Sequence, residues 1–235
     1  MTYTKICEGV YQVDEKGARH VELDNKQHSR FMDYFYIELP SDELSEEQVF
    51  KLCQARVNER RCFDENSANA KVKGLFNEFL KGHSQKSVLE VGAGTNPILT
   101  VAEAIQHSMM YKTSDADDNY QGLSYHFNAN TDLPNETFDI VIALFVLHFK
   151  FYEHQISQIF KHIKDDGIFL ANVYNRTDNA REVLVTDFKE AGFHVELFRD
   201  PNNICRDHYY LFASKSKQII SSKQQMLIDL IQNSA

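Results

Sequence analysis

Short apolar runs and amphipathic stretches alternate along residues 87–214 of the chain. Residues 138–144, FDIVIAL, form an uninterrupted apolar run, which is typical of a strand buried on both faces of a parallel sheet. After it, Ile156, Ile159 and Phe160 recur at the spacing of one helix face. Strands are expected at residues 87–91, 109–115, 124–128, 138–144, 167–173, 194–198 and 208–214. This alternation predicts the α/β class, with a Rossmann-like, seven-stranded and mostly parallel sheet and helices on both faces.

Three further helices are expected around the glycine-containing turn at residues 92–97. Residues 45–48, Ser-Glu-Glu-Gln, have the form of a capping box, which begins a helix. An apolar stripe predicts a second helix that ends at Gly82, and its members are Val72, Leu75, Phe76, Phe79 and Leu80. A third helix is expected to follow the turn, with Asn96 as its cap and Pro97 as its first residue.

The changes in periodicity predict three segments. Residues 1–86 are expected to be a cap of hairpin and helices that covers the substrate, with a hairpin turn at residues 14–17. Residues 87–214 carry the ligand-binding sheet, and residues 215–235 form a C-terminal helix. Ligands of such sheets bind beyond the carboxyl ends of the strands, where the strand order reverses.

The charge balance narrows the choice of partners. The 25 Lys and Arg residues against 34 Asp and Glu give a formal net charge of −9, which disfavours nucleic acid as the partner. The first residues lack the apolar stretch of a secretory signal. The longest apolar run, residues 140–147, is far shorter than the roughly 20 residues of a membrane-spanning helix. We expect a cytoplasmic protein without a membrane partner, and its oligomeric state stays open.

Cysteines and histidines do not indicate a metal site. The cysteines at positions 7, 53, 62 and 205 form no Cys-x-x-Cys pair, and the histidines show no zinc-binding spacing. We interpret the cysteines as free thiols and predict no metal.

A glycine turn directly after the first strand of the sheet carries the functional argument. Gly92 and Gly94 allow a sharp turn and a close approach of the backbone to a ligand. A dinucleotide fingerprint needs a third glycine at position 97, where Pro97 stands, so that reading fails in its strict form. The carboxylate of Glu90, two residues before the turn, suits a ligand with a positive charge.

This segment resembles the first motif of the class I S-adenosylmethionine-dependent methyltransferases. Glu90, Gly92 and Gly94 match three of the four fixed positions of that motif, acidic-x-Gly-x-Gly-x-Gly, and Asn96 replaces the last glycine. The resemblance implies that the turn, including Ala93, lies under the methionine and ribose parts of the methyl donor. It also implies an antiparallel last strand in the sheet.

Other landmarks of that family follow in order. Asp115 ends the second strand, where the family places an acid that accepts hydrogen bonds from both ribose hydroxyls. Residues 129–141 resemble the segment that contacts adenine, which implies Ala129 and Asn130 as contacts and leaves Asn128 as an alternative to Asn130. Ala143, at the end of the fourth strand, is a further expected cofactor contact. Only eight residues separate Asp115 from Ser124, too few for the usual helix.

His148 is the candidate catalytic residue, because it is the titratable side chain just beyond the fourth strand. As a general base it would help to deprotonate a hydroxyl nucleophile; a packing role is the alternative. Residues 143–146, Ala-Leu-Phe-Val, lack the Pro-Pro motif of enzymes that methylate the amino groups of DNA bases or glutamine.

The sequence therefore predicts a methyltransferase that uses S-adenosylmethionine and releases S-adenosylhomocysteine. The predicted acceptor is an oxygen or nitrogen of a small molecule or protein side chain, by in-line displacement that relies on alignment and exclusion of water. Two alternatives remain open. One is a non-catalytic protein that binds the methyl donor, and the other is a nucleotide-dependent oxidoreductase.

Overall fold

The structure, a computed structural model, describes residues 1–59, 68–174, 176–201 and 208–233. The chain divides into two compact units, and each is described by itself. The first unit comprises Met1–Ser67 and His148–Lys150, and the second comprises Ala68–Leu147 and Phe151–Ala235. Within the described residues, no helix is long and apolar enough to cross a membrane.

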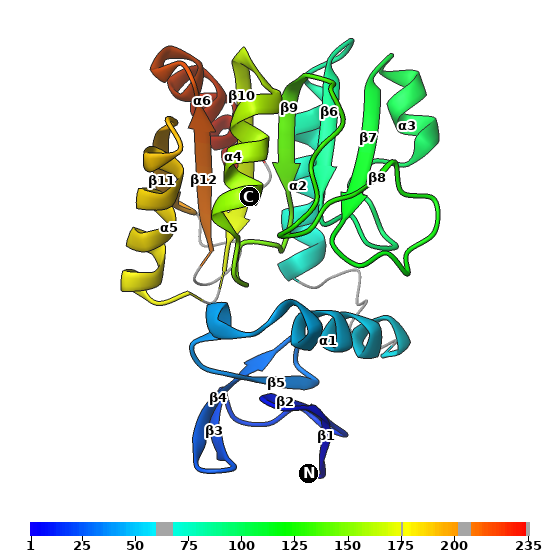
Figure 1. Cartoon of the computed structure of the whole chain (residues 1–235), viewed down its shortest axis with the longest axis vertical. Helices are drawn as coiled ribbons and strands as arrows, with labels where there is room; N and C mark the ends of the chain where they lie inside the picture. Colours follow the sequence, from blue (N-terminus) through cyan, green and yellow to red (C-terminus); the bar gives the residue numbers. More distant parts are fainter. Residues whose placement is uncertain (60–67, 175, 202–207, 234–235) are drawn as a thin grey trace. The chain divides into compact units, whose positions relative to one another are not determined.

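The second unit is built on a seven-stranded sheet in the order β11-β12-β10-β9-β6-β7-β8 (Figure 1). Its strands are β6 (Ser87–Val91), β7 (Met110–Asp115), β8 (Tyr125–His126), β9 (Phe138–Ala143), β10 (Ile163–Val173), β11 (His194–Arg199) and β12 (Tyr209–Ser214). All neighbours pair in parallel except β12, which is antiparallel to both β10 and β11. This topology confirms the predicted sheet and its antiparallel last strand.

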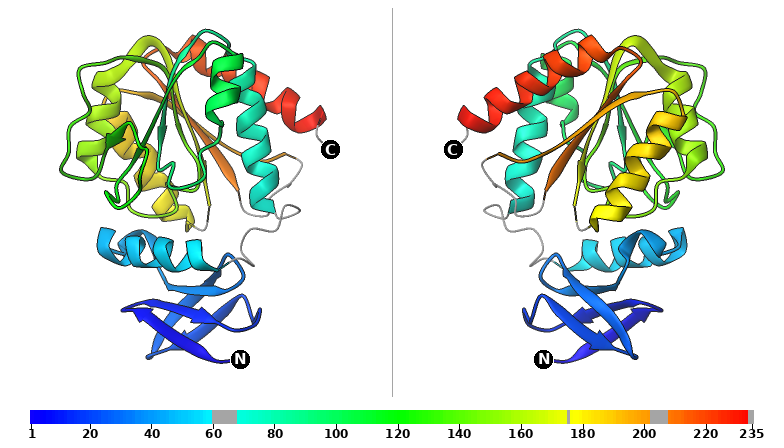
Figure 2. Two further views of the ribbon diagram at one scale, coloured as in Figure 1. Left: turned by 90° about the vertical axis from the view of Figure 1, so that its right-hand side faces the viewer. Right: turned by 90° about the vertical axis from the view of Figure 1, so that its left-hand side faces the viewer.

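Helices cover both faces of this sheet, as Figure 2 shows. On one face lie α4 (Glu153–His162) and α5 (Asp178–Glu190), and on the other lie α2 (Ala68–Lys81), α3 (Val101–Gln106) and α6 (Lys217–Asn233). Because strand side chains alternate between faces, β6 supplies Val88 to one core and Leu89 to the other. The chain leaves β7 and β8 on one side of β6 and returns to β9 on the other, so the strand order reverses beside β6.

The first unit is an antiparallel sheet in the order β1-β2-β5-β4-β3 together with α1 (Glu46–Asn58). Its strands are β1 (Tyr3–Cys7), β2 (Val10–Val13), β3 (His20–Leu23), β4 (Lys26–Phe31) and β5 (Phe35–Glu38), followed by the short helix η1 (Ser41–Glu43). The predicted hairpin at residues 14–17 is wrong, because β2 pairs with β1 and β5, and β3 pairs with β4. The tight turns lie instead at Gly9, at Asp24 and Asn25, and at Met32 and Asp33, where φ is positive.

Two of the expected helices begin or end where the sequence places them. Ser45 caps α1 in a complete capping box with Gln48, which confirms that prediction. The stripe predicted for residues 72–80 lies in α2, whose apolar members are buried. Although the sequence assigns α2 to the N-terminal cap, this helix lies in the second unit with the sheet.

The helix after the glycine turn begins later than expected. Thr100 caps α3 in a capping box with Glu103, so Asn96 is not a helix cap and Pro97 is not a first helical residue. The apolar side chains of Val101 and Ile105 in α3 do not pack inward, because Val101 is 77% exposed and Ile105 is 71% exposed. A nine-residue segment, 92–100, therefore connects β6 to α3 without helical structure.

Two further differences concern strands. The strand expected at residues 167–173 begins earlier, because β10 starts at Ile163. The third expected strand is only the two residues of β8, and no helix separates it from β7, as the short spacing indicates.

Candidate functional site

The turn that follows β6 needs glycine for geometric reasons. Gly92 and Gly94 have φ values of +74° and +53°, a region that side chains rarely adopt. A Cβ atom on Gly92 would lie 2.2 Å from Cγ2 of Val146, whereas one on Gly94 would meet nothing closer than 3.9 Å. Gly92 is therefore required by packing within the protein, whereas a Cβ on Gly94 would only touch Asp115 and Tyr120 at ordinary contact distance.

Asp115 lies against this turn. Because β6 and β7 are parallel neighbours, the end of β7 brings the Asp115 carboxylate beside the turn, and the Gly94 amide donates to Oδ2 over 2.9 Å. The Asp117 amide donates to Oδ1 over 3.0 Å. A third backbone amide, that of Ala116, also acts on this carboxylate, which has about four acceptor positions in all. Burial raises the pKa of Asp115, and the hydrogen bonds from these amides act against that rise.

Glu90 is buried to 2% exposure below the same turn. Its Oε2 accepts hydrogen bonds from the Ile98 amide, at 2.9 Å, and from the Tyr111 hydroxyl. Burial raises the pKa of Glu90 to about 7, although both hydrogen bonds lower it. We predicted that Glu90 lies at the cofactor turn. The structure places it there, with its side chain bonded to the segment that follows the turn.

Lys73 of α2 holds that segment from the outside. Its Nζ donates to the backbone oxygen of Asn96 at 3.1 Å and to the Asn96 side-chain Oδ1 at 2.5 Å. Partial burial lowers the pKa of Lys73, and the charges of Glu90 and Glu103 act against that change. Asn96, predicted as a cofactor contact, is thus fixed by a lysine that the sequence gives no reason to select.

The segment expected to contact adenine forms a tight turn. The side-chain Oδ1 of Asn128 accepts from the Asn130 amide at 2.8 Å, and the Asn128 amide donates to Oγ1 of Thr131 at 2.7 Å. The oxygen of Asn128 is thus engaged within the turn, whereas the Asn130 side chain is exposed next to half-buried Ala129. The adenine contact at Asn130, with Asn128 as the alternative, stays a prediction.

Comparison with known proteins now identifies the family. The model of a family described as a methyltransferase domain matches residues 47–222, more than half of the chain. The chain belongs to this methyltransferase family. The match confirms the predicted family and enzyme class, a methyltransferase that depends on S-adenosylmethionine.

Solved methyltransferase structures share the fold. The 1,6-didemethyltoxoflavin-N1-methyltransferase of Burkholderia thailandensis, with bound 1,6-didemethyltoxoflavin and S-adenosylhomocysteine, matches 85% of this chain and 100% of its own, at 14% identity and a TM-score of 0.54. A TehB-like S-adenosylmethionine-dependent methyltransferase of Corynebacterium glutamicum matches 73% of this chain and 100% of its own, at 10% identity and a TM-score of 0.49.

The match to the CurJ carbon methyltransferase covers 57% of this chain and 49% of that one, at 16% identity and a TM-score of 0.42. This chain therefore spans about half the length of that matched protein. Among the curated proteins, none matches the chain significantly.

Beyond β9, the methyltransferase chain is held by a residue that sequence analysis missed. Ala143 ends β9 fully buried and pairs with Val91 of β6, so it lies at the predicted edge of the sheet. Two residues later, Phe145 takes a φ of +61°, and its amide donates to Oδ1 of Asn172 at 2.6 Å. Asn172 is fully buried in β10, and an asparagine inside the run GIFLANV is the signal that could have identified it.

Tyr120 is a second residue that sequence analysis missed. Two of its ring carbons would lie 4.0 Å from a Cβ built on Gly94, on the same side as Oδ2 of Asp115. The ring and the Asp115 carboxylate therefore both face the side of Gly94 that lacks a Cβ. Its signal in the sequence is the one aromatic residue in the short segment between Asp115 and Ser124.

His148, the predicted general base, lies in the first unit with Phe149 and Lys150. Its ring lies 5.2 Å from that of Phe31 and 4.1 Å from that of Phe149, centroid to centroid. Its backbone oxygen accepts from the Ser41 hydroxyl at 3.0 Å, and the residue is 1% exposed. These contacts support the packing alternative, and a general-base role stays a prediction.

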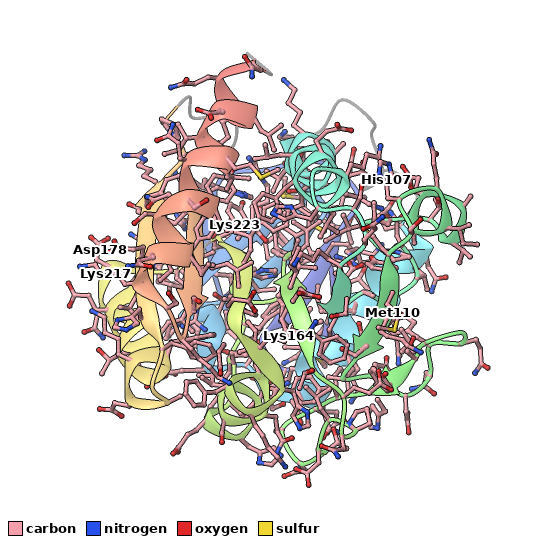
Figure 3. All side chains as sticks on the ribbon, turned by 90° about the horizontal axis from the view of Figure 1, so that it is seen from above. His107, Met110, Lys164, Asp178, Lys217 and Lys223 are labelled. Atoms are coloured by element: carbon pink, nitrogen blue, oxygen red, sulfur yellow. The ribbon has the colours of Figure 1, made fainter. Side chains whose placement is uncertain are left out.

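The opposite end of the strands carries a different carboxylate. Asp139, at the start of β9, pairs with Lys86 at 3.1 Å and with Lys164 at 2.9 Å, and it accepts from the amide and hydroxyl of Ser87. Figure 3 looks onto this end and labels Lys164. In the described residues, no three His, Cys, Asp or Glu side chains gather as metal ligands, and the predicted absence of a metal stays a prediction.

Proposed function

We propose that this chain transfers the methyl group of S-adenosylmethionine to an oxygen or nitrogen atom of a small molecule or a protein side chain. The observation that carries the proposal is the hydrogen bond from the Gly94 amide to the Asp115 carboxylate. It joins the glycine turn to the acid of the next strand at the point where the strand order reverses. Sheets of this kind bind their ligands there.

Each residue of this site has a role that fits its surroundings. The Asp115 carboxylate, an acceptor at both oxygens, receives the ribose hydroxyls, and Gly94, without a Cβ, lets the nucleoside approach the backbone closely. Asn130 offers an exposed amide to the adenine. Ala93 and Ala143 supply small side chains at the ends of β6 and β9.

Methyl transfer requires little from the protein beyond the correct placement of donor and acceptor. The sulfonium group of the donor supplies an activated methyl group, so no residue has to activate it. The residues around the turn hold the donor in line with the acceptor and keep water away, which are contributions of geometry. This accounts for a site rich in backbone contacts.

We place acceptor specificity in the predicted cap, residues 1–86. Supporting this, the residues that bind the donor in our proposal all lie after residue 86. The chain that leaves the end of β9 also contributes His148–Lys150 to the first unit.

Titration with S-adenosylhomocysteine tests the donor site. We expect wild type to bind it, and Asp115→Asn to weaken binding at least about tenfold, since a hydrogen bond to a charged partner contributes on the order of 1.5–3 kcal/mol. Asp118→Asn is the matched control, because Asp118 is an exposed acid of the same loop. Equal affinities of the two variants would reject the ribose role of Asp115.

Radiolabelled donor added to fractionated cell extract tests transfer. We expect label in a fraction of small molecules or proteins. Binding of S-adenosylhomocysteine without label in any fraction would instead support the non-catalytic alternative.

A further inference from the structure

We infer that Tyr111 is a positioning residue of the donor site. Together with Glu90, it fixes the backbone of residues 97–99, which follow the glycine turn. This inference rests on the proposed function and assigns part of its machinery to a residue outside the glycine motif. In it, Glu90 acts on the donor indirectly, by fixing the backbone of residues 97–99.

The contacts of the Tyr111 hydroxyl connect three parts of the second unit. The hydroxyl donates to Oε2 of Glu90 in β6 and accepts from the Leu99 amide at 3.2 Å. The same Oε2 accepts from the Ile98 amide at 2.9 Å. One carboxylate oxygen and one phenol oxygen therefore hold two successive amides of the segment between the turn and α3.

The placement of Tyr111 follows from the pairing of β6 and β7. In the parallel register, Tyr111 lies beside Val88 and Thr113 lies beside Glu90. Residues 111 and 113 share a face with 88 and 90, so the long tyrosine side chain reaches along that face toward Glu90. A shorter side chain at position 111 would leave the buried carboxylate without this donor.

Burial keeps the tyrosine in the form that this role needs. Burial and the adjacent Glu90 charge raise the pKa of Tyr111 far above its usual range, so its hydroxyl remains a donor at any working pH. Segment 97–99 has no helical hydrogen bonds of its own, because α3 begins only at Val101. Its position therefore depends on side chains from other elements.

Two roles of Glu90 give opposite results in Glu90→Gln. The Ile98 amide and the Tyr111 hydroxyl donate to the same carboxylate oxygen, and the amide oxygen of glutamine can accept both hydrogen bonds. If Glu90 acts through the backbone, the affinity of the Glu90→Gln variant for S-adenosylhomocysteine should stay within about threefold of the wild-type affinity. If Glu90 binds the amino group of the donor by charge, the same variant loses at least about tenfold.

The experiment measures S-adenosylhomocysteine affinity by calorimetry, with melting temperature recorded alongside. We expect Tyr111→Phe to weaken affinity about tenfold, the effect of losing about one buried hydrogen bond. Tyr210→Phe is the matched control, because the buried Tyr210 hydroxyl of β12 also donates to a carboxylate, that of Asp200, at 3.2 Å. It should lower the melting temperature and leave affinity unchanged.

A coupled pair also predicts that the effects do not add. Glu90→Leu removes the acceptor of the Tyr111 hydroxyl, so adding Tyr111→Phe to it should weaken affinity by less than Tyr111→Phe does alone, because only the bond to the Leu99 amide is still there to lose. Additive losses of affinity would overturn the inference. A tenfold loss of affinity in Glu90→Gln would overturn it as well, and that test remains available even if the Tyr111→Phe variant does not fold. No binding by wild type would reject the proposed function itself, so the two failures are distinguishable.

Discussion

Glu90 and Asp139 are carboxylates on adjacent strands of one sheet, yet their surroundings are opposite. Asp139 faces two lysines and the amide and hydroxyl of Ser87 at the amino ends of the strands. Burial raises its pKa, but these hydrogen bonds prevail and hold the pKa well below its usual range. Glu90, at the carboxyl ends, bonds to an amide and a phenol, and its pKa rises to about 7.

The difference indicates that the amino ends of the strands contribute to the stability of the unit, whereas the carboxyl ends form its candidate site. Paired with cations, Asp139 favours the folded state as an anion. Glu90 is ionised at a cost, because burial removes water and its hydrogen-bond donors are neutral. A buried acid with a perturbed pKa beside an open turn is a feature of functional sites.

The largest expected effect is the pH dependence of stability that Glu90 causes. Its folded pKa exceeds the unfolded value, so its contribution is full below about pH 4.5 and is lost as pH rises through about 7. Glu90→Gln removes that dependence and should gain on the order of 3 kcal/mol over wild type between pH 4.5 and 8. The charges that face Glu90 are Lys73 on α2 and Asp115 on β7. Chemical denaturation of wild type and of Glu90→Gln across this pH range measures the effect. If the free energies of unfolding of the two proteins changed with pH in the same way, the prediction would be contradicted.

Asp139→Asn should act in the opposite direction. Its folded pKa is depressed, so the stability it provides is present above the unfolded pKa and is lost only as pH falls through the folded value. At pH 7 the variant should lose about 2 kcal/mol, since buried donors lose part of their acceptor, and should bind S-adenosylhomocysteine as wild type does. If the Asp139→Asn variant were fully folded and still bound S-adenosylhomocysteine more weakly than wild type, the amino and carboxyl ends of the strands would not be independent.

The smallest effect is expected from a single lysine of the Asp139 cluster. The Lys164 side chain is 40% exposed, and exposed ion pairs contribute on the order of 0–1 kcal/mol. Lys164→Gln should therefore lower the free energy of unfolding by about 0.5 kcal/mol, as measured by chemical denaturation, and the loss should be smaller at high salt concentration. A loss as large as that of Asp139→Asn would mean that the lysine, and not Ser87, supplies the main stabilisation of Asp139.

The elements with strong periodicity were predictable. The apolar run FDIVIAL became β9, and the stripe from Val72 to Leu80 lies in α2, because burial on a sheet or helix face dictates both patterns. Glu90, Gly92, Gly94 and Asp115 come together because adjacent parallel strands end at one edge. That consequence follows from topology alone.

Features set by contacts distant in the sequence were not predictable. Asn96 and Pro97 have a good local pattern for a helix start, but Thr100 and Glu103 form the capping box that begins α3. The hairpin at residues 14–17 failed because β5, from farther along the chain, pairs with β2. Lys73 and Tyr111 have no local signal of their roles, since each acts on a backbone far from it in sequence. Asn172 stands out within its apolar run, but the run does not show that its partner is the Phe145 amide.

Asn96 stands where the resembling family has its last glycine, and the structure explains why this chain tolerates it. Asn96 is not among the described residues with positive φ, so no glycine is needed there. Side chains from three other elements hold backbone atoms of the segment, because Lys73 donates to the Asn96 carbonyl oxygen while Glu90 and Tyr111 accept from the two amides after Pro97. Mutational change can therefore accumulate within residues 95–97 while the shape persists. In descendants of this chain, the loss of a motif glycine would be a poor sign of lost binding, and a change at position 111 a better one.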